Sequence, residues 1–395
     1  MISIKKIILL LLFFPLSGIS QSTQLSNQSE ISVITCGPGN NELYATFGHS
    51  AFRVFDPVNK IDRVYNYGTF DFNVPNFYLN FAKGKLLYQL RAYNFGNFLQ
   101  GYHQEKRWVK EQVLDLNTND VQKIYEYLEN NAKIENRSYQ YDFFYNNCST
   151  KLYEVLEIVL GDKIIFDNTF DSKQYTHRDL IQLYLNYHPW GDFGIDLALG
   201  SVIDQKASAK EYMFLPDFVF EAFTKITVVN NSLKKPIVKQ TNNVLSDSQN
   251  TRKNNLLTPI VVFSILSILI VIRTYFDYKK GTRNKVLDFI LFFTTGSIGL
   301  VVLLLWFATN HTATFNNYNI FWAFAPNLIF AFLMLKNVKI SYWYLISVLF
   351  LLGITIFIWL FSIQAYHIAL LPILIALGTR YVYLIWYFKK GLSLK

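Results

Sequence analysis

The feature that most constrains this chain is a series of five apolar segments in its C-terminal part. They occupy residues 256–272, 286–308, 320–335, 341–361 and 367–388. A helix needs about 20 apolar residues to cross a bilayer, so most of these segments are long enough. The third is short and is expected to be tilted or interfacial. The sequence therefore predicts an all-α bundle of about five transmembrane helices over residues 256–395.

The connections between these segments alternate in charge. Residues 273–285 carry five basic residues and one acidic residue, whereas the connections 309–319 and 362–366 carry no charge. Loops rich in lysine and arginine stay in the cytoplasm. This pattern predicts a multi-pass protein of a cytoplasmic membrane, with residues 21–255 outside and the C-terminal tail inside.

The N-terminus supports the same orientation. Lys5 and Lys6 precede the apolar stretch 7–16, and the small residues Gly18 and Ser20 allow cleavage before about Gln21. Residues 1–20 therefore read as a secretory signal peptide, with an uncleaved anchor helix as the alternative.

The composition divides the chain further. Hydrophobic residues make up 51% of it, and most of the excess follows residue 255. Residues 226–255 are rich in Asn, Ser, Lys and Thr and predict a linker or a loosely packed stem. The net charge of +9 has no nucleic-acid recognition motif beside it, so no nucleic-acid partner is expected.

Residues 21–225 predict one α+β domain. Alternating residues at 50–55, a turn at 56–60 and a return strand at 64–67 indicate a hairpin that begins at His49. A further strand is expected at 110–116, and an amphipathic helix at 120–130.

Cys148 is the candidate nucleophile. It is one of two cysteines and lies in an aromatic, amide-rich run, after which apolar residues recur at helical spacing. A cysteine in the first turn of a helix is near unpaired N–H groups and the positive end of the helix dipole, which favour the thiolate. His49, at the mouth of the hairpin, is the candidate base. The alternative is a structural disulfide between Cys148 and Cys36. No metal site is expected, because no histidine pair has ligand spacing.

The order of histidine before cysteine resembles the permuted branch of the NlpC/papain-like fold, to which lecithin:retinol acyltransferase and its relatives belong. Residues 49–54 are similar to the histidine strand of that branch, and Asn147-Cys148 to its cysteine motif. The resemblance implies a third polar residue on the return strand. Asn66 is the best positional match, with Tyr67 and Asp62 as rivals.

A closer resemblance covers almost the whole chain. The segments 36–39, 47–51, 65–72 and 141–150 are similar to those of the Lnb-type periplasmic-domain family, and so are 306–311 and 316–322 in the membrane half. Lys151 departs from the arginine expected after Ser-Thr. The family is associated with N-acylation of bacterial lipoproteins.

The resemblance to the Lnb-type family implies a membrane-bound thiol acyltransferase in a bacterial inner membrane, without a cofactor, facing the periplasm. A phospholipid would donate the acyl chain to Cys148, and the N-terminal amine of a lipoprotein would accept it. The candidate catalytic residues are then Cys148, His49 and Asn66. The candidate substrate-binding residues are Tyr67, Asn147, Asn310 and His311.

Three alternatives remain open from the sequence. An NlpC-type cell-wall amidase or peptidase would use the same Cys-His pair on peptidoglycan, but it would not need five membrane segments. A phospholipase would result if water replaced the amine acceptor. A non-catalytic membrane scaffold would need neither Cys148 nor His49.

Overall fold

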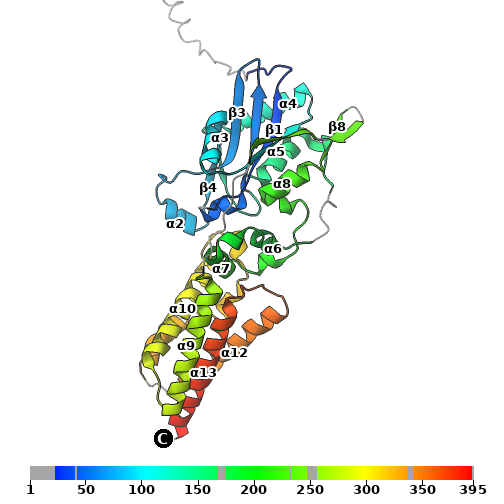
Figure 1. The fold of residues 1–395 in the computed structure, drawn as a ribbon. Helices are drawn as coiled ribbons and strands as arrows, with labels where there is room; N and C mark the ends of the chain where they lie inside the picture. Colours follow the sequence, from blue (N-terminus) through cyan, green and yellow to red (C-terminus); the bar gives the residue numbers. More distant parts are fainter. Residues whose placement is uncertain are drawn as a thin grey trace, which may run out of the picture.

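The computed structural model describes residues 23–40, 42–167, 174–230, 233–246, 256–336 and 341–393. The predicted signal peptide, residues 1–20, lies outside the described residues. A domain of strands and helices is followed by a helical bundle (Figure 1).

The N-terminal domain is built on a seven-stranded antiparallel sheet with the strand order β10-β5-β1-β2-β3-β4-β6. The strands are β1 Glu30–Cys36, β2 His49–Asp56, β3 Ile61–Thr69, β4 Leu87–Asn94, β5 Val109–Leu114, β6 Ser138–Gln140 and β10 Val238–Leu245. A smaller sheet contains β7 Ile164–Ile165, β8 Thr227–Asn230 and β9 Leu233–Pro236.

Helices cover both faces of the large sheet. Ile31 and Val33 of β1 belong to a core shared with α4 (Thr118–Asn131), α5 (Thr150–Leu160) and α8 (Pro216–Phe223). Ile34 and Cys36 point to the other face, where α3 (Phe95–Gln104) packs. Successive side chains of a strand alternate between faces, so a strand covered on both sides is apolar almost throughout.

The elements predicted for residues 31–160 are confirmed. The expected hairpin is the pair β2 and β3, in which Phe52 faces Tyr65. The strand expected at 110–116 is β5, the helix expected at 120–130 is α4, and the helix that follows Cys148 is α5.

The predicted linker needs a correction. Residues 227–230, 233–236 and 238–245 form β8, β9 and β10, and β10 pairs with β5 at the edge of the large sheet. Ile226, Val228 and Ile237 are fully buried in the main core. This segment is therefore part of the N-terminal domain.

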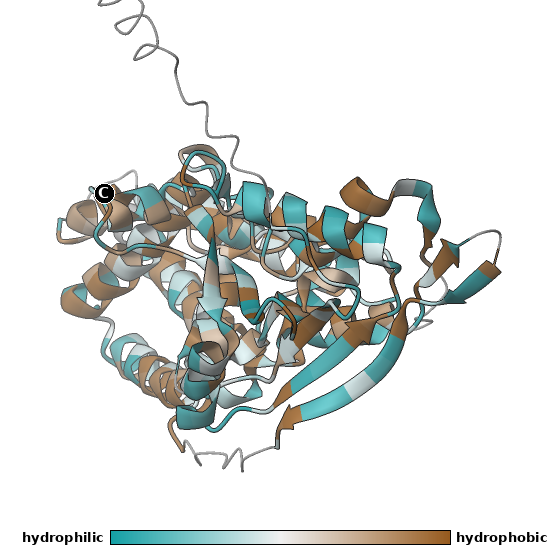
Figure 2. Ribbon diagram, turned by 90° about the horizontal axis from the view of Figure 1, so that it is seen from above, coloured by the Kyte–Doolittle hydropathy of each residue, from teal (hydrophilic) through white to brown (hydrophobic). Residues whose placement is uncertain are grey.

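The bundle contains four helices that are long and apolar enough to cross a membrane, counted over the described residues. They are α9 Pro259–Lys280, α10 Lys285–Phe307, α12 Ser341–Leu360 and α13 Leu370–Ser393. These helices are apolar over most of their length. Figure 2 shows hydrophilic stretches on strands of the sheet domain.

The third predicted span, 320–335, is the one that differs. Its helix, α11 (Asn327–Met334), has only eight residues. The backbone before it lies so close to α10 that a Cβ on Gly299 would come within 1.8 Å of the Ala323 carbonyl oxygen. The carbonyl of Met334 accepts a hydrogen bond from Arg283, just before α10 begins. The segment thus follows α10 along much of its length, as an irregular stretch and a short helix. One face of this helix is buried, while Ile329 and Phe332 are exposed.

Charged side chains are buried at the end of the bundle remote from the sheet domain. Arg380 of α13 pairs with Asp277 of α9 at 2.8 Å and with Asp288 of α10 at 2.7 Å. Arg283, one of the basic loop residues, is also buried and pairs with Asp288 at 2.9 Å. Buried charges need such partners because isolated ones are costly in an apolar medium.

A layer of short helices joins the two parts. It includes α6 (His177–Gln182) and α7 (Pro189–Ala198), held together by Arg178, which pairs with Asp196 and Asp204 at 2.6 Å each. The side chain of Asn317, beyond α10, donates to the carbonyls of Leu197 and Ala198 at the end of α7. The sheet domain is thereby seated on one end of the bundle (Figure 1).

Candidate active site

Cys148 lies in the turn directly before α5, and Asn147 holds that turn. The Asn147 side-chain oxygen accepts hydrogen bonds from the backbone N–H groups of Ser149 (2.8 Å) and Thr150 (2.9 Å). Its amide donates to the carbonyls of Phe143 (2.8 Å) and Phe214 (2.7 Å). This capping satisfies N–H groups at the start of the helix. Asn147 is buried and positions Cys148; because it also lines the cavity at Cys148, its expected role in substrate binding stays a prediction.

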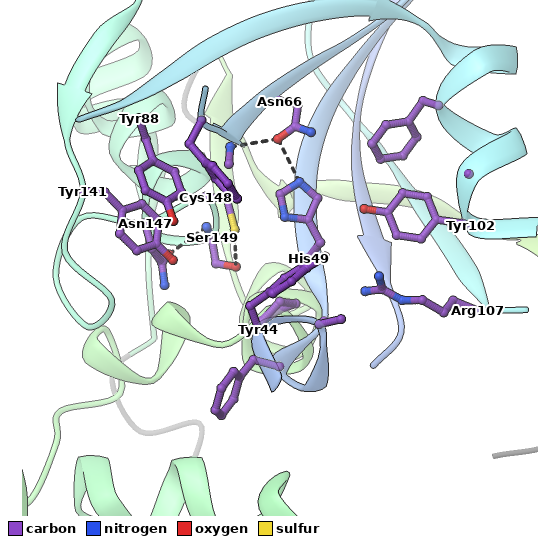
Figure 3. A pocket seen from close by; sticks show the side chains of 18 of the residues that line it. Tyr44, His49, Asn66, Tyr88, Tyr102, Arg107, Tyr141, Asn147, Cys148 and Ser149 are labelled. Atoms are coloured by element: carbon purple, nitrogen blue, oxygen red, sulfur yellow. Dashed lines mark hydrogen bonds between the residues drawn. The ribbon is translucent and has the colours of Figure 1, made fainter. Parts of the chain in front are cut away.

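His49 is the first residue of β2, and β3 fixes its ring. The distance from His49 Nε2 to Asn66 Oδ1 is 2.9 Å, and the same oxygen accepts the N–H of Gly68 at 2.8 Å. Because Asn66 offers an acceptor, Nε2 carries the proton and Nδ1 is left for another partner. Figure 3 shows the His49 ring next to Asn66, with Cys148 to the left of the ring.

The rivals to Asn66 lie elsewhere. Asp62 pairs with Arg53 at 2.8 Å. Tyr67 is buried in the main core, and burial raises its pKa. Because β3 alternates its side chains between two faces, Tyr67 points away from the side on which Asn66 meets His49. The expected substrate-binding role of Tyr67 is therefore corrected to a place in the core.

The electrostatics favour an ion pair between Cys148 and His49. Burial alone would raise the pKa of the thiol, but the charge and hydrogen bond of His49 outweigh it and the pKa of Cys148 is lowered. Burial alone would lower the pKa of His49, but the charge and hydrogen bond of Cys148 raise it. The hydrogen bond that His49 Nε2 donates to Asn66 Oδ1 also raises the pKa of His49. A thiolate is the reactive form of cysteine.

Cys36 is a different kind of cysteine. Both cysteines are free, so no disulfide joins them. Cys36 is fully buried in β1, opposite His49 in the register of β1 and β2. Burial raises the pKa of its thiol to about 12. It is therefore a packed apolar side chain.

A cavity of about 460 Å³ opens at Cys148. This volume is within the usual range of about 300–1,000 Å³ for small-molecule sites. Aromatic side chains form much of its wall, and the lining residues include members of β2, β3, β4, α3 and the loops around Cys148. The aromatic lining residues are Tyr44, Phe47, Phe70, Tyr88, Tyr93, Phe98, Tyr102, Tyr141, Phe143 and Phe214.

Asn310 and His311 do not line this cavity. The backbone N–H of Asn310 donates to the carbonyl of Lys83 at 2.9 Å, and His311 Nε2 lies 3.1 Å from the carbonyl oxygen of Phe81. Both residues thus contact α2 (Phe77–Ala82) and the turn after it. They therefore lie at the contact between α2 and the bundle, and their predicted place at the rim of a lipid site stays a prediction.

Two cavity residues were not predicted as functional. A Cβ on Gly68 would come within 2.6 Å of His49 Cε1, so only glycine lets the ring occupy its place beside Asn66. Arg107 is buried beside the cavity, donates to the carbonyl of Gly37 at 2.7 Å and pairs with Glu105 at 2.9 Å. Gly68 lies within the motif 65–72, which was a usable signal. Nothing in the sequence around Arg107 indicates that it lies at a functional site.

Within the described ranges, no group of three or more His, Cys, Asp or Glu side chains is placed to hold a metal ion. The candidate site therefore consists of a thiol, an imidazole and an amide at the wall of an aromatic cavity.

Comparison with family models gave two matches. The model described as the Lnb N-terminal periplasmic domain matches residues 20–186, and the model described as the Lnb transmembrane domain matches residues 251–391. No curated protein and no solved structure matches the chain.

Proposed function

Because this chain belongs to the Lnb family, and is a membrane protein with a periplasmic domain, we propose that it is a thiol acyltransferase. Cys148 takes an acyl chain from a phospholipid as a thioester and passes it to the N-terminal amine of a lipoprotein. The observation that carries this proposal is that Cys148 and His49 line the same cavity, where each shifts the pKa of the other toward a thiolate and an imidazolium. The order of His49 on β2 and Cys148 before α5 also fits the permuted papain-like arrangement that we propose for this domain.

The first half of the reaction forms the thioester. The Cys148 thiolate attacks the carbonyl carbon of the donor ester, and the bond to the glycerol oxygen breaks. His49 gives its proton to that oxygen, so the lysophospholipid leaves as an alcohol. Asn66 holds the imidazole in the orientation that this proton transfer needs.

The second half transfers the acyl chain. The amine attacks the thioester carbonyl, His49 accepts the proton from the nitrogen, and Cys148 leaves as a thiolate. An α-amino group has a pKa near 8, so more of it is unprotonated at neutral pH than of a lysine with a pKa near 10.4. An N-terminal acceptor therefore suits the chemistry better than a lysine side chain does.

Mass spectrometry of lipoprotein N-termini tests this function. Cells that contain the protein should carry an additional acyl chain on these amines, and cells without it, or with Cys148→Ser, should carry free amines. Unchanged N-termini together with release of free fatty acid would indicate a phospholipase. Unchanged N-termini together with altered cell-wall peptides would indicate an amidase of NlpC type.

A further inference from the structure

An exposed aromatic surface lies between β3 and β4. Four large apolar side chains point to solvent from α2 and the loop before it, with exposed fractions of 60% for Phe72, 77% for Tyr78, 52% for Leu79 and 49% for Phe81. α2 buries none of its own residues. We call residues 70–87 the α2 segment. So large a group of exposed apolar side chains marks an interaction surface.

The α2 segment is held at the end of the bundle. The carbonyl groups of Phe81 and Lys83 contact His311 and Asn310, as described above. In addition, a Cβ on Gly84 would come within 2.6 Å of the backbone nitrogen of His311. The segment 310–311 begins three residues after α10 ends at Phe307. Since α10 is long and apolar enough to cross a bilayer, its contact with α2 puts the exposed aromatic side chains beside the membrane boundary.

The composition of the α2 segment suits a lipid surface. Aromatic side chains are enriched at the level of the lipid headgroups, where an apolar ring with a polar tip is well accommodated. Lys83 and Lys85 are exposed in the turn after α2, and Asp71 is the only acidic residue in the segment. Lysines at a membrane surface are attracted to anionic headgroups.

A row of neighbouring aromatic rings leads from this surface to the cavity of Cys148. The ring centroids of Phe77 and Phe70 lie 5.9 Å apart, those of Phe70 and Tyr88 5.1 Å, and those of Tyr88 and Tyr141 4.1 Å. Phe70, Tyr88 and Tyr141 also line the cavity of Cys148. The exposed surface and the cavity are therefore continuous.

We propose that the α2 segment inserts into the outer leaflet of the bilayer and guides lipid acyl chains along the aromatic row to Cys148. The insertion stands independently of the reaction, whereas the guiding role rests on the proposed acyl transfer. The two parts are tested separately.

Spin labels on the full-length chain in phosphatidylethanolamine–phosphatidylglycerol vesicles test the insertion. Labels are placed at Tyr78→Cys and, separately, Leu79→Cys, in a Cys148→Ala background; Cys36 is fully buried and does not compete for label. The matched control is Val58→Cys, which is 59% exposed in the turn at the far end of β2 from His49. Labels at 78 and 79 should collide more with oxygen than with a water-soluble nickel chelate, and the label at 58 should show the reverse. If labels at 78 and 79 behave like the label at 58, the insertion is wrong.

Aspartate substitutions test the guiding role. A charged side chain is costly in a membrane, so Tyr78→Asp with Leu79→Asp should lower acyl transfer from vesicle phospholipid by about tenfold or more. Val58→Asp should have no effect. Alkylation of Cys148 by iodoacetamide should be equally fast in the wild-type protein, the double variant and Val58→Asp, which would show that the site is intact.

The outcomes separate the claims. Full transfer in the doubly substituted protein, with insertion shown by the labels, would leave the α2 segment as an anchor and overturn its guiding role. No transfer by the wild-type protein would contradict the proposed function while the result of the spin labels stands.

Discussion

At the scale of the residue, the reactivity of Cys148 depends on His49. In this buried site, the imidazolium and its hydrogen bond outweigh the burial that would otherwise raise the thiol pKa. Removing the imidazole should leave burial as the dominant influence.

The first prediction concerns the pH dependence of this thiol. Because the pKa of Cys148 is lowered, alkylation by iodoacetamide should remain fast at neutral pH and fall as the pH drops through the lowered pKa. In His49→Ala the midpoint should move to higher pH. Mass spectrometry of the alkylated Cys148 peptide measures the pH profile of alkylation in the two proteins. Cys36, with a pKa of about 12, should stay unmodified as an internal control. An identical pH profile in the two proteins would contradict the ion pair.

The second prediction concerns Gly68. A Cβ there would come within 2.6 Å of His49 Cε1 and 3.4 Å of Asn66 Oδ1, so Gly68→Ala should displace the ring. A misplacement of about 1 Å can cost on the order of 100-fold in rate, and we expect a loss of that size in kcat/KM for acyl transfer. Gly101→Ala is the matched control, because Gly101 also lines the cavity and a Cβ there meets nothing within 4 Å. Equal activity in the two variants would contradict the close approach of Gly68 to His49.

The sequence was informative about the chemistry of single residues but less so about where they point. It marks Cys148, His49 and Asn66 as candidates, and the structure brings these three together. It also suggests Asn147 and Tyr67 as substrate contacts because they adjoin two of them. A neighbour in sequence can face the opposite way, as Tyr67 does in the core, whereas Asn147 caps α5 and also lines the cavity.

At the scale of the element, the hairpin and the helices of the sheet domain were predictable because each has a clear hydrophobic period. β10 was not. It is an edge strand whose residues are largely exposed, so its sequence is polar and reads as a linker. α11 differs from its prediction for another reason, since hydropathy measures the apolar length of a segment but not where its backbone stops being helical.

The third prediction follows from β10. A periplasmic fragment that ends at residue 225 removes Ile226, Val228 and Ile237 from the core and uncovers the edge of β5. Each lost apolar side chain is worth about 1.5–3 kcal/mol of burial, so this fragment should aggregate. A fragment that ends at residue 246 should have a higher melting temperature and stay in solution better. Size-exclusion chromatography and thermal unfolding compare the two, and equal behaviour would show that β8–β10 add nothing to the domain.

At the scale of the whole molecule, the sheet domain, the layer of α6 and α7 and the bundle place the candidate site close to the membrane. Contacts such as the bond from Thr312 to Asp142 at 2.5 Å join the loop after α10 to the turn before Cys148. The orientation of the bundle, predicted from loop charge, decides which compartment this site faces.

The fourth prediction tests that orientation. Reporter fusions at about residues 279 and 337 should report the cytoplasm, and fusions at about 313 and 364 the periplasm. Lysine and arginine occur in the connections around 279 and 337 and not in those around 313 and 364. The fusion at 337 matters most, since it asks whether the segment with the short helix α11 crosses the bilayer. A periplasmic signal there would mean that this segment turns back.

The central claim is a thioester on Cys148, and its direct measurement is the fifth prediction. Purified full-length protein is incubated with phospholipid that carries a labelled acyl chain, without an amine acceptor. The label should appear on the Cys148 peptide by mass spectrometry, be released by hydroxylamine, and be absent in Cys148→Ser. It should then move to a diacylated lipoprotein peptide with a free N-terminus and stay in place with an N-acetylated one. Transfer to the free N-terminus at the wild-type rate by Cys148→Ser, with no labelled enzyme at any time, would contradict the account.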